Sequence, residues 1–147
     1  MIHLFPRSWL PVFLALILSP GLGAAESQAV DPVLLSGLKV APVGGLEVCF
    51  DVWYSNRLGH PEIKAEVSAK ILAETKNFGE VLDTEVVAIQ SISKRITRYY
   101  VAVYFARRPV WIRIDRYTLR DRWFFLPFKY SLEADEILPG FITDLVP

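Results

Sequence analysis

The chain has 147 residues, of which 52% are hydrophobic, with 16 basic and 16 acidic side chains and one cysteine. A chain of this length holds one domain, and a processed chain of about 120 residues can bury a core without disulfides or a metal. The balanced charge differs from the strongly basic composition of many nucleic-acid-binding proteins.

The N-terminus has the pattern of a signal peptide. Arg7 precedes an apolar run of ten residues, Trp9–Leu18, which is too short to span a bilayer, and small residues follow it up to Ala25. We expect residues 1–25 to be removed by cleavage after Ala25, or alternatively after Ala29. The protein is then periplasmic or secreted, without a stable membrane anchor after cleavage; an uncleaved anchor is the alternative.

The charges are unevenly distributed along the chain. Residues 94–129 hold ten basic and two acidic side chains, whereas residues 26–93 hold five basic and ten acidic ones. One interpretation places these lysines and arginines, including Arg107 and Arg108, on solvated strand edges and turns, where they prevent edge-to-edge pairing. The other is a surface that binds an anionic ligand or partner.

Two segments follow the signal peptide. Residues 26–45 form a linker or a short helix, for which Asp31 is the expected cap and Pro32 the first-turn residue. Residues 46–58 have helical spacing, with an apolar side made of Leu46, Cys49, Phe50, Trp53, Tyr54 and Leu58. The single Cys49 cannot form an internal disulfide, and we expect it to be a buried thiol.

A second helix is predicted from Pro61 to Phe78. Proline suits the first helical position, and Gly79 is a natural C-terminal cap. Its apolar stripe, which indicates a helix laid on a sheet, consists of Ile63, Val67, Ile71 and Leu72.

Four β-strands are predicted at Leu82–Ser93, Ile96–Phe105, Val110–Thr118 and Arg122–Leu132. Their residues alternate, and large aromatic side chains occur on both faces. In the last strand, Phe124 and Phe128 are expected on one face and Trp123, Phe125 and Lys129 on the other. Pro127 cannot donate to a strand ladder, so it marks an edge position or a bulge.

The predicted fold is therefore α+β, with two or three N-terminal helices packed on a curved four-stranded antiparallel sheet. Residues 46–140 form the single domain, and residues 141–147 form a C-terminal tail.

No catalytic, metal or cofactor motif is apparent. His60 is the only histidine that remains after signal cleavage, and it has no cluster of ligands at metal-binding spacing. Neither a Ser/His/Asp arrangement nor a glycine loop for phosphate is present. The basic and aromatic residues 94–100 resemble a nucleic-acid surface, but export and the balanced charge argue against that partner.

The layout resembles the nuclear transport factor 2-like (cystatin-like α+β) superfamily, in particular its small exported bacterial members. The resemblance covers roughly residues 46–138. It rests on Phe78–Val81 between helix and sheet, and on Val110–Tyr117 leading through Arg120–Trp123 into Phe124–Phe128. The chain departs from the pattern at Arg122, where a turn glycine often precedes the tryptophan.

This resemblance implies a cone-like sheet with an apolar pocket, in a superfamily that contains isomerases, dehydratases, ligand binders and interaction modules. Its members often pair through the sheet face. Replacing Trp111 by a charged residue is then expected to give a monomer.

Two functions remain. The first is an exported non-enzymatic module that binds a small apolar or anionic ligand, or a protein partner, through the cone pocket or the sheet face, with a homodimer as one form. Its candidate ligand-binding residues are Trp53, Tyr54, Tyr100, Tyr104, Trp111 and Asp115. The alternative is an isomerase or dehydratase that uses an acid/Tyr pair, with Asp115 as the base. A structural role for Asp115 is instead an ion pair with a cross-strand arginine, Arg98 or Arg122.

Overall fold

The structure is a computed structural model that describes residues 29–55 and 61–143. The predicted signal peptide and its cleavage after Ala25 lie outside the described residues. So do His60, Gly59, Leu58 and residues 144–147.

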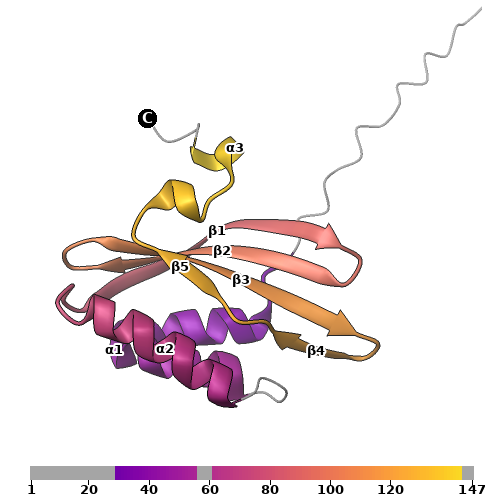
Figure 1. Cartoon of the computed structure of the whole chain (residues 1–147), viewed down its shortest axis with the longest axis horizontal. Helices are drawn as coiled ribbons and strands as arrows, with labels where there is room; N and C mark the ends of the chain where they lie inside the picture. Colours follow the sequence, from indigo (N-terminus) through magenta and orange to yellow (C-terminus); the bar gives the residue numbers. More distant parts are fainter. Residues whose placement is uncertain (1–28, 56–60, 144–147) are drawn as a thin grey trace, which may run out of the picture.

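The fold is α+β, with two helices preceding an antiparallel sheet of five strands (Figure 1). Strands β1 to β4 are neighbours in chain order, and β5 pairs with β3 beyond the end of β4. The elements are α1 Pro32–Ser55, α2 Pro61–Thr75, β1 Val81–Ser93, β2 Ile96–Phe105, β3 Pro109–Leu119, β4 Arg122–Phe125, β5 Lys129–Ser131, the short 3₁₀ helix η1 Ala134–Glu136, and α3 Gly140–Thr143.

Helix α1 begins at the predicted cap. The Asp31 carboxylate accepts hydrogen bonds from the backbone N–H groups of Val33, at 2.8 Å, and Leu34, at 3.3 Å. Such a side chain satisfies amide groups that have no partner inside the helix. The structure therefore confirms Asp31 as the cap and Pro32 as the first helical residue.

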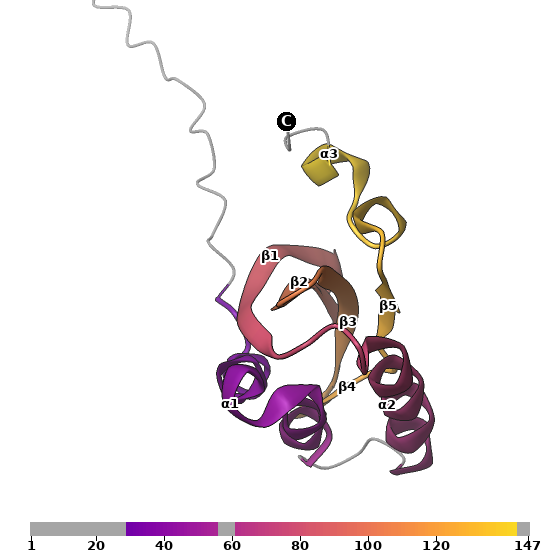
Figure 2. The same ribbon diagram turned by 90° about the vertical axis from the view of Figure 1, so that its left-hand side faces the viewer.

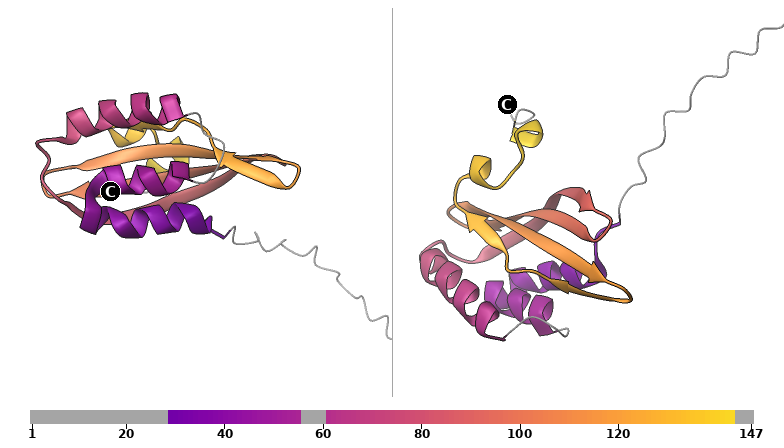
Figure 3. Two further views of the ribbon diagram at one scale, coloured as in Figure 1. Left: turned by 90° about the horizontal axis from the view of Figure 1, so that it is seen from below. Right: turned by 45° about the vertical axis from the view of Figure 1, so that its right-hand side comes forward.

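The two predicted segments on either side of residue 45 form one element with a kink. Gly45 has a φ of 79°, and the arms that flank it pack against each other. Gly37 lies so close to Trp53 that an added Cβ would overlap the indole ring. Figure 3 shows the second arm running back beside the first. The separate short helix and second helix expected from the sequence are thus joined through a glycine in the left-handed region.

The length and apolar composition of α1 alone would allow it to cross a membrane, and it is the one helix of the described part with that property. The core helix of a folded domain, or a signal sequence near the N-terminus, can have the same length and apolar composition. Here the kink divides α1 into arms of about 20 Å or less, against a hydrocarbon core of about 30 Å. Its buried residues pack on the sheet, so α1 is a core helix, and export stays a prediction from residues 1–25.

Helix α2 starts at Pro61 as predicted and ends earlier than expected. Its last residue is Thr75 rather than Phe78. A turn follows, in which the Phe78 N–H donates to the Thr75 carbonyl at 2.9 Å. Gly79 then has a φ of 87°, so it supplies the left-handed residue where the chain enters the sheet.

Strands β1, β2 and β3 form the long part of the sheet, and they lie within one residue of the predicted bounds. Strand β1 carries register irregularities at three places along its pairing with β2. Bulges of this kind bend a strand, and Figure 2 shows β1 curving around the sheet.

The last predicted strand is divided in two by a break at Leu126–Phe128. Trp123 and Phe125 belong to the core on the helix side, and so do Phe128 and Tyr130. Phe124 lies on the other face, against Tyr117. The expectation that Phe124 and Phe128 share a face is therefore wrong. The extra residue at Pro127, which cannot donate to a ladder, reverses the alternation.

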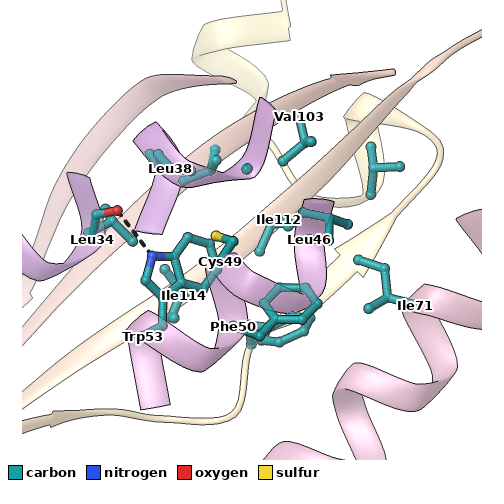
Figure 4. Packing of buried hydrophobic residues seen from close by; sticks show 14 of the residues in the cluster. Leu34, Leu38, Leu46, Cys49, Phe50, Trp53, Ile71, Val103, Ile112 and Ile114 are labelled. Carbon is teal, nitrogen blue, oxygen red and sulfur yellow. Dashed lines mark hydrogen bonds between the residues drawn. The ribbon is translucent and has the colours of Figure 1, made fainter. Parts of the chain in front are cut away.

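The main core lies between the helices and one face of the sheet, which we call the inner face. It is built from side chains that are at most 9% exposed, among them Leu34, Cys49, Phe50, Trp53, Ile71, Val101, Val103, Ile112 and Ile114 (Figure 4). The rings of Phe50 and Phe128 stack at 4.8 Å.

The opposite side of the sheet, the outer face, is partly covered by the chain's own C-terminal segment, residues 132–143. Ile137 and Leu138 of this segment pack on Tyr100, with Trp111 at the border. Figures 1 and 3 show η1 and α3 on the side of the sheet away from α1 and α2. The sheet thus has a thick layer on one side and a thin, incomplete one on the other.

Candidate functional site

The inner face, where the sequence analysis expected a pocket, is occupied by side chains of α1. Trp53 is 2% exposed, and its indole N–H donates to the Leu34 carbonyl at 3.0 Å (Figure 4). Tyr54 is half-buried, and burial raises the pKa of its hydroxyl above the usual value. Its hydroxyl also lies 3.4 Å from the Leu126 carbonyl, to which it donates. These two predicted ligand-binding residues are therefore packed and hydrogen-bonded within the fold.

Cys49 belongs to the same layer. It is fully buried, and burial raises the pKa of its thiol above the ordinary value. A thiol in this setting is protonated and unreactive, so the prediction of a buried thiol is confirmed.

The other four predicted site residues come together on the outer face. Tyr100 and Tyr104 lie on β2, and Trp111 and Asp115 lie on β3. Both tyrosine hydroxyls donate to β1, Tyr100 to Gln90 and Tyr104 to Glu85, each at 2.9 Å. Burial and the bond to Glu85 raise the pKa of Tyr104. These contacts tie neighbouring strands together.

Asp115 is paired rather than free. The Arg98 guanidinium donates to both of its carboxylate oxygens, at 2.7 and 2.8 Å, and the two side chains are 23% and 19% exposed. The hydrogen bond to Asp115 raises the pKa of Arg98 above its ordinary value. Because Arg98 and Asp115 are register partners on β2 and β3, this is the predicted cross-strand ion pair.

Two further cations on this face escaped the sequence analysis. Arg113 and Lys129 are register partners on β3 and β5, so their side chains lie next to each other. Neither side chain forms a hydrogen bond or an ion pair with another described residue. The sequence signal for this pair was Pro127, because the break there moves Lys129 to the same face as Arg113.

An open apolar strip lies beyond the Arg98–Asp115 pair. Tyr117 and Phe124 are register partners whose rings meet edge to face at 5.4 Å. Both are half-buried, and the neighbouring Leu119 is 46% exposed. The outer face therefore has a part covered by the C-terminal segment, a central band of charged residues and an open strip.

No protein-family model, no curated protein and no solved structure matches this chain. Within residues 29–55 and 61–143, no group of three or more histidine, cysteine or carboxylate side chains is placed to hold a metal ion. The candidate site is therefore defined by its geometry alone, as the charged band around Arg113 and Lys129.

Proposed function

We propose that this protein is an exported, non-enzymatic binding module that holds a small anionic ligand on its outer sheet face, between Arg113 and Lys129. The observation that carries the proposal is the direct pairing of these two cations without a carboxylate from the described chain. Like charges opposite each other on adjacent strands are destabilising. A carboxylate or phosphate between them would offset that repulsion.

The chemistry of the two side chains suits such a ligand. A guanidinium binds a carboxylate or phosphate through two parallel hydrogen bonds, whereas an ammonium group acts as a compact point charge. Nearby, Asp115 is already held by Arg98, so it does not compete for Arg113. The band can then present net positive charge to an anion.

The packed inner face supports the outer face as the binding surface. A ligand in a cone-like pocket would need space that Trp53 and Phe50 fill, since both are at most 2% exposed. The isomerase or dehydratase alternative needs a carboxylate base in an apolar setting, whereas Asp115 is bound by Arg98 on the outer face. No specific contact favours that alternative.

Membership of the nuclear transport factor 2-like superfamily forms part of this proposal. It is supported by the order of the elements, with helices before a curved antiparallel meander. The resemblance implied pairing of two copies through the sheet face. In this chain Trp111 packs beside the C-terminal segment, so a Trp111→Asp variant would disturb the monomer as well as a dimer.

The test is an NMR titration of the isotope-labelled protein, purified from the exported fraction, with inorganic phosphate and with succinate. We expect saturable shifts of the Arg113 and Lys129 amide signals. An Arg113→Gln/Lys129→Gln variant should bind at least about tenfold more weakly, which corresponds to about 1.4 kcal/mol. A Lys39→Gln variant, altered at an exposed site on α1, is the matched control. Equal weakening in the control, or shifts spread evenly over the surface, would contradict the proposal.

A further inference from the structure

Two hairpin turns meet at one end of the sheet. The β1–β2 turn contains Lys94 and Arg95, and the β3–β4 turn contains Arg120 and Asp121. The Thr118 N–H donates to the Arg95 carbonyl at 2.8 Å, so the turns are joined directly. Figure 1 shows both turns at the same end of the molecule. We call this region, residues 91–96 and 118–122, the hairpin end.

The hairpin end is strongly basic. Lys94, Arg95, Arg120 and Arg122 are all exposed, and Asp121 is the single acid, which gives four positive charges against one negative. None of the four cations forms an ion pair with another described residue. At the opposite end of the sheet, in contrast, Arg108 pairs with Glu133 at 3.1 Å.

Exposed apolar side chains flank these charges. Ile92 is 42% exposed and Leu119 is 46% exposed, one beside each turn. Apolar side chains next to lysine and arginine are typical of surfaces that bind anionic membranes, where the apolar groups enter the interface and the cations meet headgroup phosphates.

Arg120, in the two-residue turn between β3 and β4, places a cation at the tip of the hairpin end. It has a φ of 56°, and it is the only residue other than glycine with a positive φ in the described chain. Glycine or asparagine would adopt this conformation with less strain. Strained residues of this kind concentrate at functional sites. The tip therefore carries a cation at a position where the backbone favours glycine.

The chain also enters the domain at this end. Asp31, at the start of α1, pairs with Arg116 near the end of β3, with 3.0 Å between the carboxylate and the guanidinium. Figures 1 and 3 show the start of α1 on the same side as the turns. The described part of the chain thus begins near the hairpin end.

We propose that the hairpin end docks reversibly on the surface of an anionic lipid bilayer. Ile92 and Leu119 enter the headgroup region, and the four cations contact lipid phosphates. A protein partner is less well supported, because a stable interface buries about 800 Å² on each side, whereas the exposed apolar contribution here is two side chains. This contact is peripheral, so it requires no membrane-spanning segment.

The docking surface is separate from the proposed anion site. Leu119 lies six residues along β3 from Arg113, which is about 20 Å at the rise of a strand. Substitutions at the hairpin end are therefore expected to leave phosphate binding at Arg113 and Lys129 unchanged, and the reverse holds as well. The two proposals can fail independently.

The test is vesicle co-sedimentation of the protein purified from the exported fraction, with its leader removed as established by intact mass. One kind of vesicle contains phosphatidylcholine alone, and the other contains phosphatidylcholine with about 30% phosphatidylglycerol, both in about 0.1 M salt. We expect binding to the anionic vesicles only, reduced at higher salt. Each cation near the surface is worth about fivefold in affinity, so Lys94→Gln/Arg95→Gln should weaken binding about 25-fold. Leu119→Ser should weaken it with little change in salt dependence.

Two control variants bear on the interpretation. Arg107→Gln removes an exposed cation at the other end of the sheet, and Arg113→Gln/Lys129→Gln removes the proposed anion site. Both should bind anionic vesicles like the unmodified protein. Equal binding to neutral vesicles, a similar loss in either control, or full competition by millimolar inorganic phosphate would each overturn the proposal. An absence of binding to the anionic vesicles would also overturn it, and an acidic protein bound through Lys94 and Arg95 would then be the occupant instead.

Discussion

The same strands supply both faces of the sheet, but the two faces are packed in different ways. On the inner face, side chains of α1 such as Phe50 and Trp53 fill the space against the strands and are at most 2% exposed. On the outer face, polar pairs connect neighbouring strands, and the C-terminal segment contributes chiefly Ile137 and Leu138.

If the proposed anion site is correct, this difference separates stability from recognition. Burial of apolar surface is the dominant favourable contribution to folding, and it is concentrated on the inner face. The outer face keeps charged and aromatic groups within reach of solvent, at Arg113, Lys129, Tyr117 and Phe124. Changes on the inner face should therefore cost stability, whereas changes on the outer face should alter binding or the C-terminal cover.

The largest expected effect comes from the same substitution made on each face. Trp53→Ala removes a buried indole and its hydrogen bond to Leu34, and it should lower the free energy of unfolding by about 3–5 kcal/mol. Trp111→Ala removes a half-buried ring of the outer face, and it should cost about 1 kcal/mol. Urea unfolding followed by circular dichroism measures both. Equal costs would show that the outer face carries as much of the core energy as the inner face.

A smaller effect is expected from the C-terminal cover. Leu138 is 6% exposed, and Leu138→Ser should cost about 2 kcal/mol at most, because the segment can detach while the inner core stays packed. Hydrogen exchange should then accelerate at η1 and around Tyr100, and remain slow around Trp53. Arg107→Ser, at an exposed position between β2 and β3, is the control. Faster exchange throughout the sheet would mean that the cover and the core unfold together.

The strands were predictable from the sequence because their pattern is local. Alternating apolar residues placed β1, β2 and β3 within one residue of their observed bounds. The start of α2 at Pro61 and the cap at Asp31 also follow from a few neighbouring residues. The alternation along β2 also holds, because Tyr99, Val101, Val103 and Phe105 all belong to the core on the helix side.

What the sequence did not reveal depends on contacts between distant segments. The two arms of α1, which are joined at Gly45, can pack closely because Gly37 leaves room for the Trp53 ring. The two residues of this contact are sixteen positions apart in the sequence. The break at Pro127 was foreseen as a bulge, but its consequence for the faces required the register with β3.

The candidate site was predicted in the same uneven way. Tyr100, Tyr104, Trp111 and Asp115 do share a face, because strand alternation is enough to group them. Arg113 and Lys129 were missed, since the pair exists only after the reversal at Pro127. Trp53 was assigned to a pocket that its own ring helps to fill.

The smallest expected effect concerns the Arg98–Asp115 pair, and it tests whether the central band of the outer face serves stability or binding. In a double-mutant cycle with Arg98→Met and Asp115→Asn, we expect a coupling energy of about 1 kcal/mol, because both side chains are partly exposed to water. The raised pKa of Arg98 keeps the guanidinium charged, so this contribution should persist from neutral to strongly alkaline pH.

The phosphate titration should show a second consequence of breaking the Arg98–Asp115 pair. Once Asp115 is neutral and Arg98 is released, three cations face the ligand instead of two, so Asp115→Asn should bind phosphate more tightly than the unmodified protein. Weaker binding would mean that Asp115 holds the band in its binding geometry, and the pair would then belong to the site rather than to the scaffold.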